Sequence, residues 1–166
     1  VEPAPVERVL ADGSLVALEH GRHLVCTVRP DAPIQILLTG HMDTVFPVDH
    51  TFQEQKWCDD GTLNGPGVAD MKGGIAVMLA ALSAADTVPE FHRAGYQVMI
   101  NSDEETGSAS SAALIATLAK GKLAALTYEP SALPDGTLAG ARPGSGNFSI
   151  IVTGRSAHAG RNPQDG

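Results

Sequence analysis

The sequence contains little cysteine, few aromatic residues and comparatively little positive charge. The two cysteines, Cys26 and Cys58, are far apart and belong to no CxxC motif or Cys/His cluster, which argues against a disulfide scaffold. Eleven Lys and Arg residues stand against 19 Asp and Glu residues, a formal net charge of −8. A nucleic-acid or anionic-membrane partner would call for a basic face, and no apolar stretch approaches the length of a membrane span. Metal cations are more compatible with this charge balance.

Glycine and proline, by contrast, are plentiful, and the chain is long enough to bury a core. Its 166 residues include 18 Gly and 11 Pro, which indicates many tight turns, and 43% of the residues are hydrophobic. This length and composition predict one globular domain.

Strand-like and helix-like segments alternate along the chain. Residues 33–40 and 95–102 are nearly continuous apolar runs, typical of strands buried on both faces, and residues 123–130 are expected to form a third strand. Helices are expected at residues 72–85, which are apolar nearly all round, and at residues 108–120. The alternation predicts an α/β domain with a mostly parallel sheet and helices on both faces.

Other segments are expected to form shorter elements. Residues 14–21 and 22–30 are predicted to pair as two strands that turn near Gly21, and the turn-rich residues 52–67 are predicted to form an exposed hairpin. From residue 147 the sequence changes to a new strand, followed by a stretch rich in Gly, Asn and Pro. This change indicates the opening of another structural unit.

Possible metal ligands follow the predicted strands at the point where each strand ends. In open α/β sheets, ligands bind beyond the carboxyl ends of the strands, and in a parallel sheet these ends share one edge. A further acidic residue lies in the Gly-rich turn before the first helix. Strand by strand, with the turn last, the candidates are His41 and Asp43; Asp103, Glu104 and Glu105; Glu129; and Asp70.

These residue types suit a metal site. Imidazole and carboxylate ligands suit Zn²⁺, and two ions about 3.5–4 Å apart can clamp a hydroxide and a substrate oxygen. Asp70 is short and lies in a tight turn, which suits a bridging carboxylate. Glu104 and Glu105 should point in different directions, so that one can bind metal while the other holds a proton for a water. Asp43 could accept the second ring N–H of His41.

Each candidate also has an ordinary structural explanation. His41 alone is more often a structural histidine at a strand end, and Asp70 can stabilise a helix N-terminus through the helix dipole. The acidic run at residues 103–105 can be a solvated loop, and Glu129 before a proline can be a turn residue. The structural explanation has to hold at all four places at once, which favours the metal site. The other loop histidines are expected on the surface: His20, His23, His50 and His92.

Five short motifs occur in an order and spacing that resemble a known enzyme family. They are GHMDTV (40–45), GPGVADMKGG (65–74), NSDEETGS (101–108), YEP (128–130) and GRSAHAG (154–160). The chain from Ile34 to Gly166 is similar to the co-catalytic zinc metallopeptidases that include glutamate carboxypeptidase, acetylornithine deacetylase, succinyl-diaminopimelate desuccinylase and aminoacylase. Any one motif is weakly specific, whereas five in register are highly specific.

The resemblance implies a zinc exopeptidase-like catalytic domain with two Zn²⁺ ions, with Co²⁺ or Mn²⁺ as alternatives. By position, His41 would bind one ion and Asp70 would bridge both. Glu105 would bind the other ion, and Glu129 would complete the ligands of the first. In this family the peptide bond after the bridging aspartate is often cis.

Three further roles follow from the resemblance. Glu104 would be the general base that takes a proton from the bridging water and later passes it to the leaving amine. Asp43 would orient His41. His158 resembles a histidine of the family's lid or dimerisation domain, where it reaches into a partner subunit's site to hold the substrate's carbonyl oxygen or carboxylate.

The resemblance therefore implies a hydrolase of amide bonds that uses a metal-bridging hydroxide. The GPG before Asp70 and the proline after Glu129 are most similar to the glutamate carboxypeptidase branch, which implies release of a C-terminal acidic residue. A deacylase or desuccinylase of N-acyl amino acids and an inactive relative are the alternatives. The expected partners are a small peptide or N-acyl amino acid and a second copy of the chain, with no nucleic acid and no membrane. A cytoplasmic location is expected, with a periplasmic or secreted one as the alternative.

The sequence departs from the family at both ends. The family's second zinc takes another histidine from near the C-terminus, and no residue after His158 can supply it; the usual N-terminal helix is also missing. We therefore expect a fragment, with a partial catalytic domain at residues 1–143 and the first strand of a lid domain within residues 144–166. On its own, such a fragment is expected to be inactive or to bind its second metal poorly.

Overall fold

The computed structural model describes residues 1–166 except residues 142, 145, 147 and 153. Its centre is a four-stranded sheet with the strand order β3–β7–β4–β8. Strand β4 runs parallel to β7 and β8, whereas β3 at the edge is antiparallel to β7. The predicted α/β class with a mostly parallel sheet is confirmed. The strands are Leu24–Val28 (β3), Ile34–His41 (β4), Ala94–Asn101 (β7) and Ala124–Thr127 (β8).

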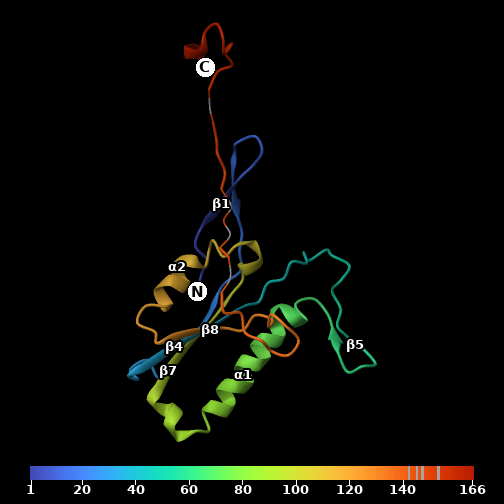
Figure 1. The fold of residues 1–166 in the computed structure, drawn as a ribbon, viewed down its shortest axis with the longest axis vertical. Coiled ribbons are helices and arrows are strands. Elements are labelled where there is room, and N and C mark those ends of the chain that lie inside the picture. The colour runs from blue at the N-terminus through green and yellow to red at the C-terminus, as the bar shows by residue number, and fades with distance from the viewer. Residues whose placement is uncertain (142, 145, 147, 153) are drawn as a thin grey trace.

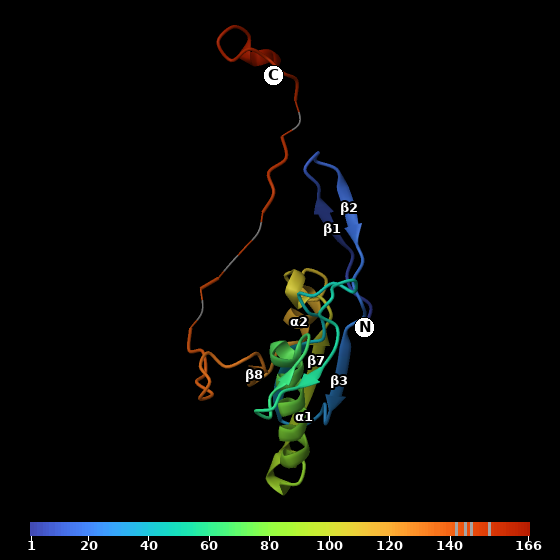
Figure 2. The same ribbon diagram turned by 90° about the vertical axis from the view of Figure 1, so that its right-hand side faces the viewer.

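Helix α1 (Gly73–Ala85) covers one face of the sheet (Figure 2). Its Met78 and Leu82 join a buried cluster with Leu38 of β4 and Val98 of β7. Burying an aliphatic side chain of this size stabilises the fold by about 1.5–3 kcal/mol. This cluster is the main contact between helix and sheet.

The opposite face of the sheet is buried as well. Side chains alternate along a strand, so Leu37 and Met99 point away from α1, and they are only 1% and 0% exposed. Helix α2 (Ala112–Leu118) lies on the other side of the strands from α1 (Figure 1). It is shorter than the predicted helix over residues 108–120 because the serines that precede it bind the loop after β7.

The outer face of α1 is exposed, which differs from the buried helix that its composition predicts. Val77 and Leu79 are 60% and 56% exposed. The segment Val68–Ala85 is long and apolar enough to span a membrane by length and composition, with 18 residues and a mean hydropathy of 1.5. The expectation that no apolar stretch approaches that length is therefore wrong. In the structure the backbone is non-helical at Asp70 within this segment, and its helical part packs on the sheet.

The predicted pairing of residues 14–21 with residues 22–30 is wrong. Strand β2 (Leu15–Leu18) pairs with β1 (Val6–Val9) instead, and β3 pairs with β7. A tight turn at Gly13, whose φ is 84°, closes the β1–β2 hairpin, and joining β7 lets β3 extend the buried sheet. In Figure 1 this hairpin projects beyond the end of the central sheet.

The remaining elements are short. The hairpin predicted within residues 52–67 is confirmed as β5 (Lys56–Trp57) paired antiparallel with β6 (Leu63–Asn64). The cis peptide bond that the family resemblance implies is present between Asp70 and Met71. Short helical turns occupy Val68–Lys72 (η1), Pro89–Arg93 (η2), Glu104–Thr106 (η3) and Pro163–Asp165 (η4).

The described parts of the chain after residue 141 lead away from the sheet (Figures 1 and 2). Residue 147, where a new strand was predicted to begin, and residue 153 lie outside the described residues. Residues 148–152 form no strand, since no other described segment pairs with them and an unpaired strand leaves its backbone groups without partners. The division into domains at residues 143 and 144 stays a prediction.

A close approach between Gly74 and Tyr128 brings the start of α1 against the end of β8, and it gives a first prediction. A Cβ atom at position 74 would collide with the carbonyl oxygen of Tyr128. Gly→Ala in an open helix position stabilises by about 1 kcal/mol. Gly74→Ala is expected instead to lower the free energy of unfolding by about 2 kcal/mol, because the helix must shift. Urea unfolding measures this.

The matched control is Ser83→Ala, on the exposed face of the same helix, where the serine side chain bonds only the carbonyl of Leu79. This variant should change the free energy of unfolding by less than about 0.5 kcal/mol. Equal effects of the two substitutions would show that the contact with Tyr128 does not constrain α1.

Candidate metal centre

The carboxyl ends of the three parallel strands meet at one edge of the sheet. His41 is the last residue of β4, and its register partner on β7 is Asn101. The pair Glu104 and Glu105 lies in η3, shortly after β7, and Glu129 follows β8. The turn η1, held against β8 by the start of α1, carries Asp70 to the same edge.

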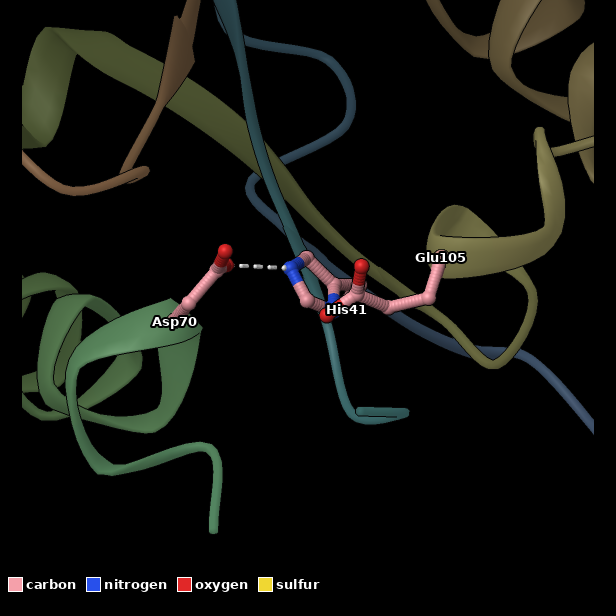
Figure 3. Close-up of side chains that lie close together, drawn as sticks. All are labelled: His41, Asp70 and Glu105. Carbon is pink, nitrogen blue, oxygen red and sulfur yellow. Dashed lines mark hydrogen bonds and ion pairs between the residues drawn. The ribbon is translucent and has the colours of Figure 1, made fainter. Parts of the chain in front are cut away.

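The structure gathers four of the predicted site residues around His41. These residues form two groups of three side chains that share His41, and within each group the ligand atoms lie within 4.8 Å of one another. One group joins His41 to Asp70 and Glu105, and Figure 3 shows these side chains reaching toward one another from three separate elements. The other group joins His41 to Glu104 and Glu129.

The imidazole of His41 is the centre of this cluster and is only 1% exposed. Its Nε2 lies 3.0 Å from Asp70 Oδ1, 3.6 Å from Glu129 Oε1 and 4.0 Å from Glu104 Oε2. The other ring nitrogen, Nδ1, lies 3.1 Å from the backbone carbonyl oxygen of Asp43. A proton on Nδ1 can be donated to that carbonyl, which leaves the lone pair of Nε2 free among the carboxylates.

Asp43 contacts Glu105 as well as His41, the one contact that was predicted for it. Its carboxylate Oδ1 lies 3.3 Å from His41 Nδ1, but the hydrogen bond to the ring is accepted by the backbone carbonyl of Asp43. Its Oδ2 accepts a hydrogen bond of 2.9 Å from the backbone N–H of Glu105. One side chain therefore connects the end of β4 to the loop after β7.

Met71 connects the end of β4 to η1. The backbone N–H of His41 donates to Met71 Sδ at 3.1 Å, and Met71 is fully buried. A Cβ atom on Gly40 would lie 2.8 Å from Met71 Cε, so glycine is the residue that leaves room for this thioether. The sequence motifs gave no signal for this contact, which fixes the position of Asp70 relative to His41.

Burial and mutual repulsion shift the acid–base properties of the cluster. Burial raises the pKa of Glu105 above its usual value, and the nearby Asp70 carboxylate raises it further. Burial likewise raises the pKa of Glu129, against the opposing effect of His41. Burial alone would lower the pKa of His41, but the carboxylates of Asp70 and Glu129 outweigh it and raise the pKa. The cluster thus favours bound protons or another positive charge.

The donor set fits a divalent cation. An imidazole nitrogen and carboxylate oxygens are ligands that Zn²⁺, Co²⁺ and Mn²⁺ accept, and their spacing here matches a shared ion. Burial is the main reason that the pKa values of Glu105 and Glu129 are raised, and a cation would offset the further increase that the neighbouring carboxylates cause. The separate roles predicted for the neighbours Glu104 and Glu105, and the bridging role of Asp70, stay predictions.

Asp103, considered a possible ligand with its two neighbours, points away from the cluster. It is fully buried, and its Oδ2 accepts hydrogen bonds from Ser110 N and Oγ and from Ser111 N at 2.7, 2.7 and 3.1 Å. Burial alone would raise the pKa of Asp103, but hydrogen bonds led by those from Ser111 and Ser110 lower it to about 2. Asp103 thus anchors the loop that carries Glu104 and Glu105. The signal in the sequence was the pair of serines ahead of α2.

The predictions for the loop histidines hold in part. His50 and His92 are exposed, as predicted. His23 is only 2% exposed, so its predicted surface position is wrong; its ring nitrogens lie 3.5 Å from Ser102 Oγ and 3.4 Å from Ser110 Oγ. His20 is half-buried. The pairing of β3 with β7 carries His23 inward, and this pairing was not predicted.

His158 does not lie at the cluster of its own chain. It is exposed and belongs to the C-terminal segment, which Figure 1 shows far from the sheet. Its ring accepts a hydrogen bond of 3.1 Å from the backbone of Gly160. A role in the site of a partner subunit stays a prediction.

Comparison with known proteins identifies the family to which this chain belongs. The model of peptidase family M20/M25/M40 matches residues 37–159, a range that contains every residue of the cluster and His158. The chain belongs to this family. The resemblance inferred from the five motifs is thereby confirmed.

Three curated relatives illustrate the range of the family. The chain is 32% identical to Carboxypeptidase G2 of Pseudomonas sp. (strain RS-16) over 88% of this chain and 35% of that protein. It is 39% identical to Succinyl-diaminopimelate desuccinylase 2 of Shewanella loihica over 45% of this chain and 21% of that protein. It is 33% identical to Acetylornithine deacetylase of Proteus mirabilis over 75% of this chain and 32% of that protein. The chain thus spans about a third or less of the length of these relatives.

The hydrogen bonds of Asp103 lead to a second prediction. Asp103→Ala would leave buried N–H and O–H groups of Ser110 and Ser111 without an acceptor, and it should lower the free energy of unfolding by about 3 kcal/mol. The matched control is Asp60→Ala, which removes two similar bonds, from Thr62 N and Oγ1, in an exposed turn. Its effect should stay below about 1 kcal/mol. Urea unfolding of both variants checks this, and equal losses would contradict it.

The raised pKa of His41 leads to a third prediction, for the protein stripped of metal by a chelator. Because the folded state binds this proton more tightly than the unfolded chain, the stabilisation is complete below about pH 6.5, the ordinary histidine pKa. It is lost as the pH rises through the folded-state pKa. The free energy of unfolding should therefore be lower at pH 8.5 than at pH 6.

The variant His41→Asn tests the origin of this pH dependence. It cannot take up the proton, so the difference in its free energy of unfolding between pH 6 and pH 8.5 should shrink relative to the unmodified protein. An unchanged difference would place the titrating group elsewhere.

Proposed function

We propose that the complete protein is a metal-dependent hydrolase of amide bonds that uses two Zn²⁺ ions. The observation that carries this proposal is the arrangement of four carboxylates around the buried His41 at the edge where three parallel strands end. Membership of a peptidase family supports it, as do relatives named as a carboxypeptidase, a desuccinylase and a deacetylase. Its residues would be His41, Asp70, Glu105 and Glu129 as metal ligands.

The reaction would be divided between the metal and Glu104. Bound Zn²⁺ would act as a Lewis acid that polarises the substrate carbonyl and acidifies a water. The Glu104 carboxylate, 46% exposed and 4.0 Å from His41, is accessible to a water at the cluster. It would take the proton of the water as the oxygen attacks the carbonyl carbon, and return it to the amide nitrogen as the C–N bond breaks. The products are a carboxylate and an amine.

The substrate proposed is a peptide or N-acyl amino acid from which a C-terminal acidic residue is released. The motifs around Asp70 and Glu129 support this, together with the similarity to Carboxypeptidase G2 over most of this chain. A deacylase or desuccinylase of N-acyl amino acids is the second candidate, supported by the other two relatives. Both reactions would use the same metal site and the same proton transfer.

We also propose a homodimer in which His158 contributes to the partner's site. The exposure of His158 and the course of the C-terminal segment, which leaves its own sheet, support this assembly.

The fourth prediction tests the proposed function in the complete protein. Glu104→Gln keeps the size of the side chain but removes the base, so it should retain zinc and lose about 10²–10⁴-fold in kcat toward N-acyl-glutamate substrates. Glu105→Ala removes a predicted ligand, so it should lower the zinc content. Mass spectrometry of bound metal and an assay of released glutamate measure the two effects.

The matched control is Glu54→Gln, an exposed glutamate outside the cluster, which should leave zinc content and kcat unchanged. Absence of zinc from the unmodified complete protein would disprove the metal site. Bound zinc without hydrolysis of any N-acyl amino acid would identify a non-catalytic relative.

A further inference from the structure

A cavity of about 290 Å³ opens directly beside the cluster of candidate metal ligands around His41. Its lining includes Asp70 and Glu105 of the cluster together with the apolar side chains of Val45, Phe46 and Phe52. When the scissile amide of a substrate lies at the cluster, a substituent of that substrate next to the amide can therefore enter this cavity. This volume is just below the range of about 300–1,000 Å³ for pockets that hold a whole ligand, so it suits one substituent of a substrate.

The aromatic side of the cavity is formed by the loop between β4 and β5. The rings of Phe46 and Phe52 meet edge to face with their centroids 5.0 Å apart, and His50 lies 5.1 Å from Phe46. Both phenylalanines are half-buried although neither belongs to the core cluster beneath α1. The two rings pack against each other and form part of the wall of the cavity.

Local hydrogen bonds hold this loop in shape. The backbone N–H of Phe46 donates to Thr44 Oγ1 at 3.2 Å, and that of Phe52 donates to His50 Nδ1 at 3.0 Å. Gln53 Nε2 donates to the carbonyl oxygen of Pro47 at 2.7 Å. The two rings are therefore positioned before any ligand binds, which reduces the entropy lost on binding.

The charges of the lining select the kind of group that can enter. Among the described residues that line the cavity, none is cationic, and the two that are charged are the carboxylates of Asp70 and Glu105. These two residues are the proposed metal ligands, and a bound cation would offset their charge. Among its described residues the lining therefore offers an anionic leaving amino acid no cation to pair with, whereas a neutral apolar group would bury its surface against the two phenylalanines. The acyl side of the substrate meets this requirement.

We infer that this cavity is the acyl-binding subsite and that Phe46 and Phe52 select substrates with a neutral, apolar acyl group of about one ring in size. The inference rests on the proposed amide hydrolysis, and it adds the chemistry of the acyl group. Phe46 and Phe52 determine specificity here and take no part in the chemical step.

The fifth prediction compares two substrates of the complete protein, N-phenylacetyl-L-glutamate and N-acetyl-L-glutamate, which differ only in the acyl group. Phe46→Ala and Phe52→Ala should each lower kcat/KM for the phenylacetyl substrate about tenfold or more, because the ring loses its apolar contacts. The acetyl substrate should change by less than about threefold, since it does not reach the rings. The zinc content should stay the same.

The control is Val48→Ala, in the same loop but 95% exposed and outside the cavity lining, which should not change the ratio of the two kcat/KM values. Phe46→Leu, which keeps apolar volume, guards against loss of folding in the alanine variants and should give an intermediate ratio. An unchanged ratio in Phe46→Ala and Phe52→Ala, or an equal loss toward both substrates, would overturn the inference.

A binding measurement separates failure of the subsite from failure of the proposed function. If the unmodified protein hydrolyses neither substrate, the proposed function fails, and saturation-transfer NMR with phenylacetamide then tests the cavity alone. Binding to the unmodified protein that is lost in Phe46→Ala but kept in Val48→Ala supports the subsite. No binding to the unmodified protein overturns it.

Discussion

The parallel arrangement of β4, β7 and β8 is the constraint on which the rest of the site depends. Parallel strands end on the same side of a sheet, so residues far apart in the sequence reach one edge without any long excursion of the chain. His41 needs only to be the last residue of its strand, and Glu129 only to follow its own strand closely. The long apolar runs of β4 and β7 are buried on both faces and therefore hold this edge in place.

Gathering carboxylates at one edge is electrostatically unfavourable, and the structure opposes it with hydrogen bonds outside the cluster. The Asp43 carboxylate binds the backbone of Glu105, and Asp103 binds the serines ahead of α2. Neither interaction reduces the charge of the cluster. Both fix the loop after β7 and so keep Glu105 at the cluster, where burial and the neighbouring carboxylates raise its pKa.

Much of this arrangement could be predicted from sequence because the relevant signals are local. The strands around Leu38 and Val98 follow from uninterrupted apolar runs, and the candidate ligands follow from acidic residues at the ends of those runs. The partner of a strand is not a local property, which is why β3 was assigned to β2 instead of β7 and why the burial of His23 was missed. The role of Asp103 depends on serines brought close by the fold, so its neighbours in the sequence suggested a ligand.

The contact of Met71 with the end of β4 has a consequence for engineering this protein. The sulfur of Met71 accepts a hydrogen bond from the backbone N–H of His41, and Met71 is covalently bonded to Asp70. Met71 therefore links two site residues that are 29 positions apart in the chain. The methyl end of that side chain rests on the space left by Gly40. A side chain at position 40 would displace Met71 and, we expect, change the separation of His41 and Asp70, and a library that varied only the polar residues would overlook this position.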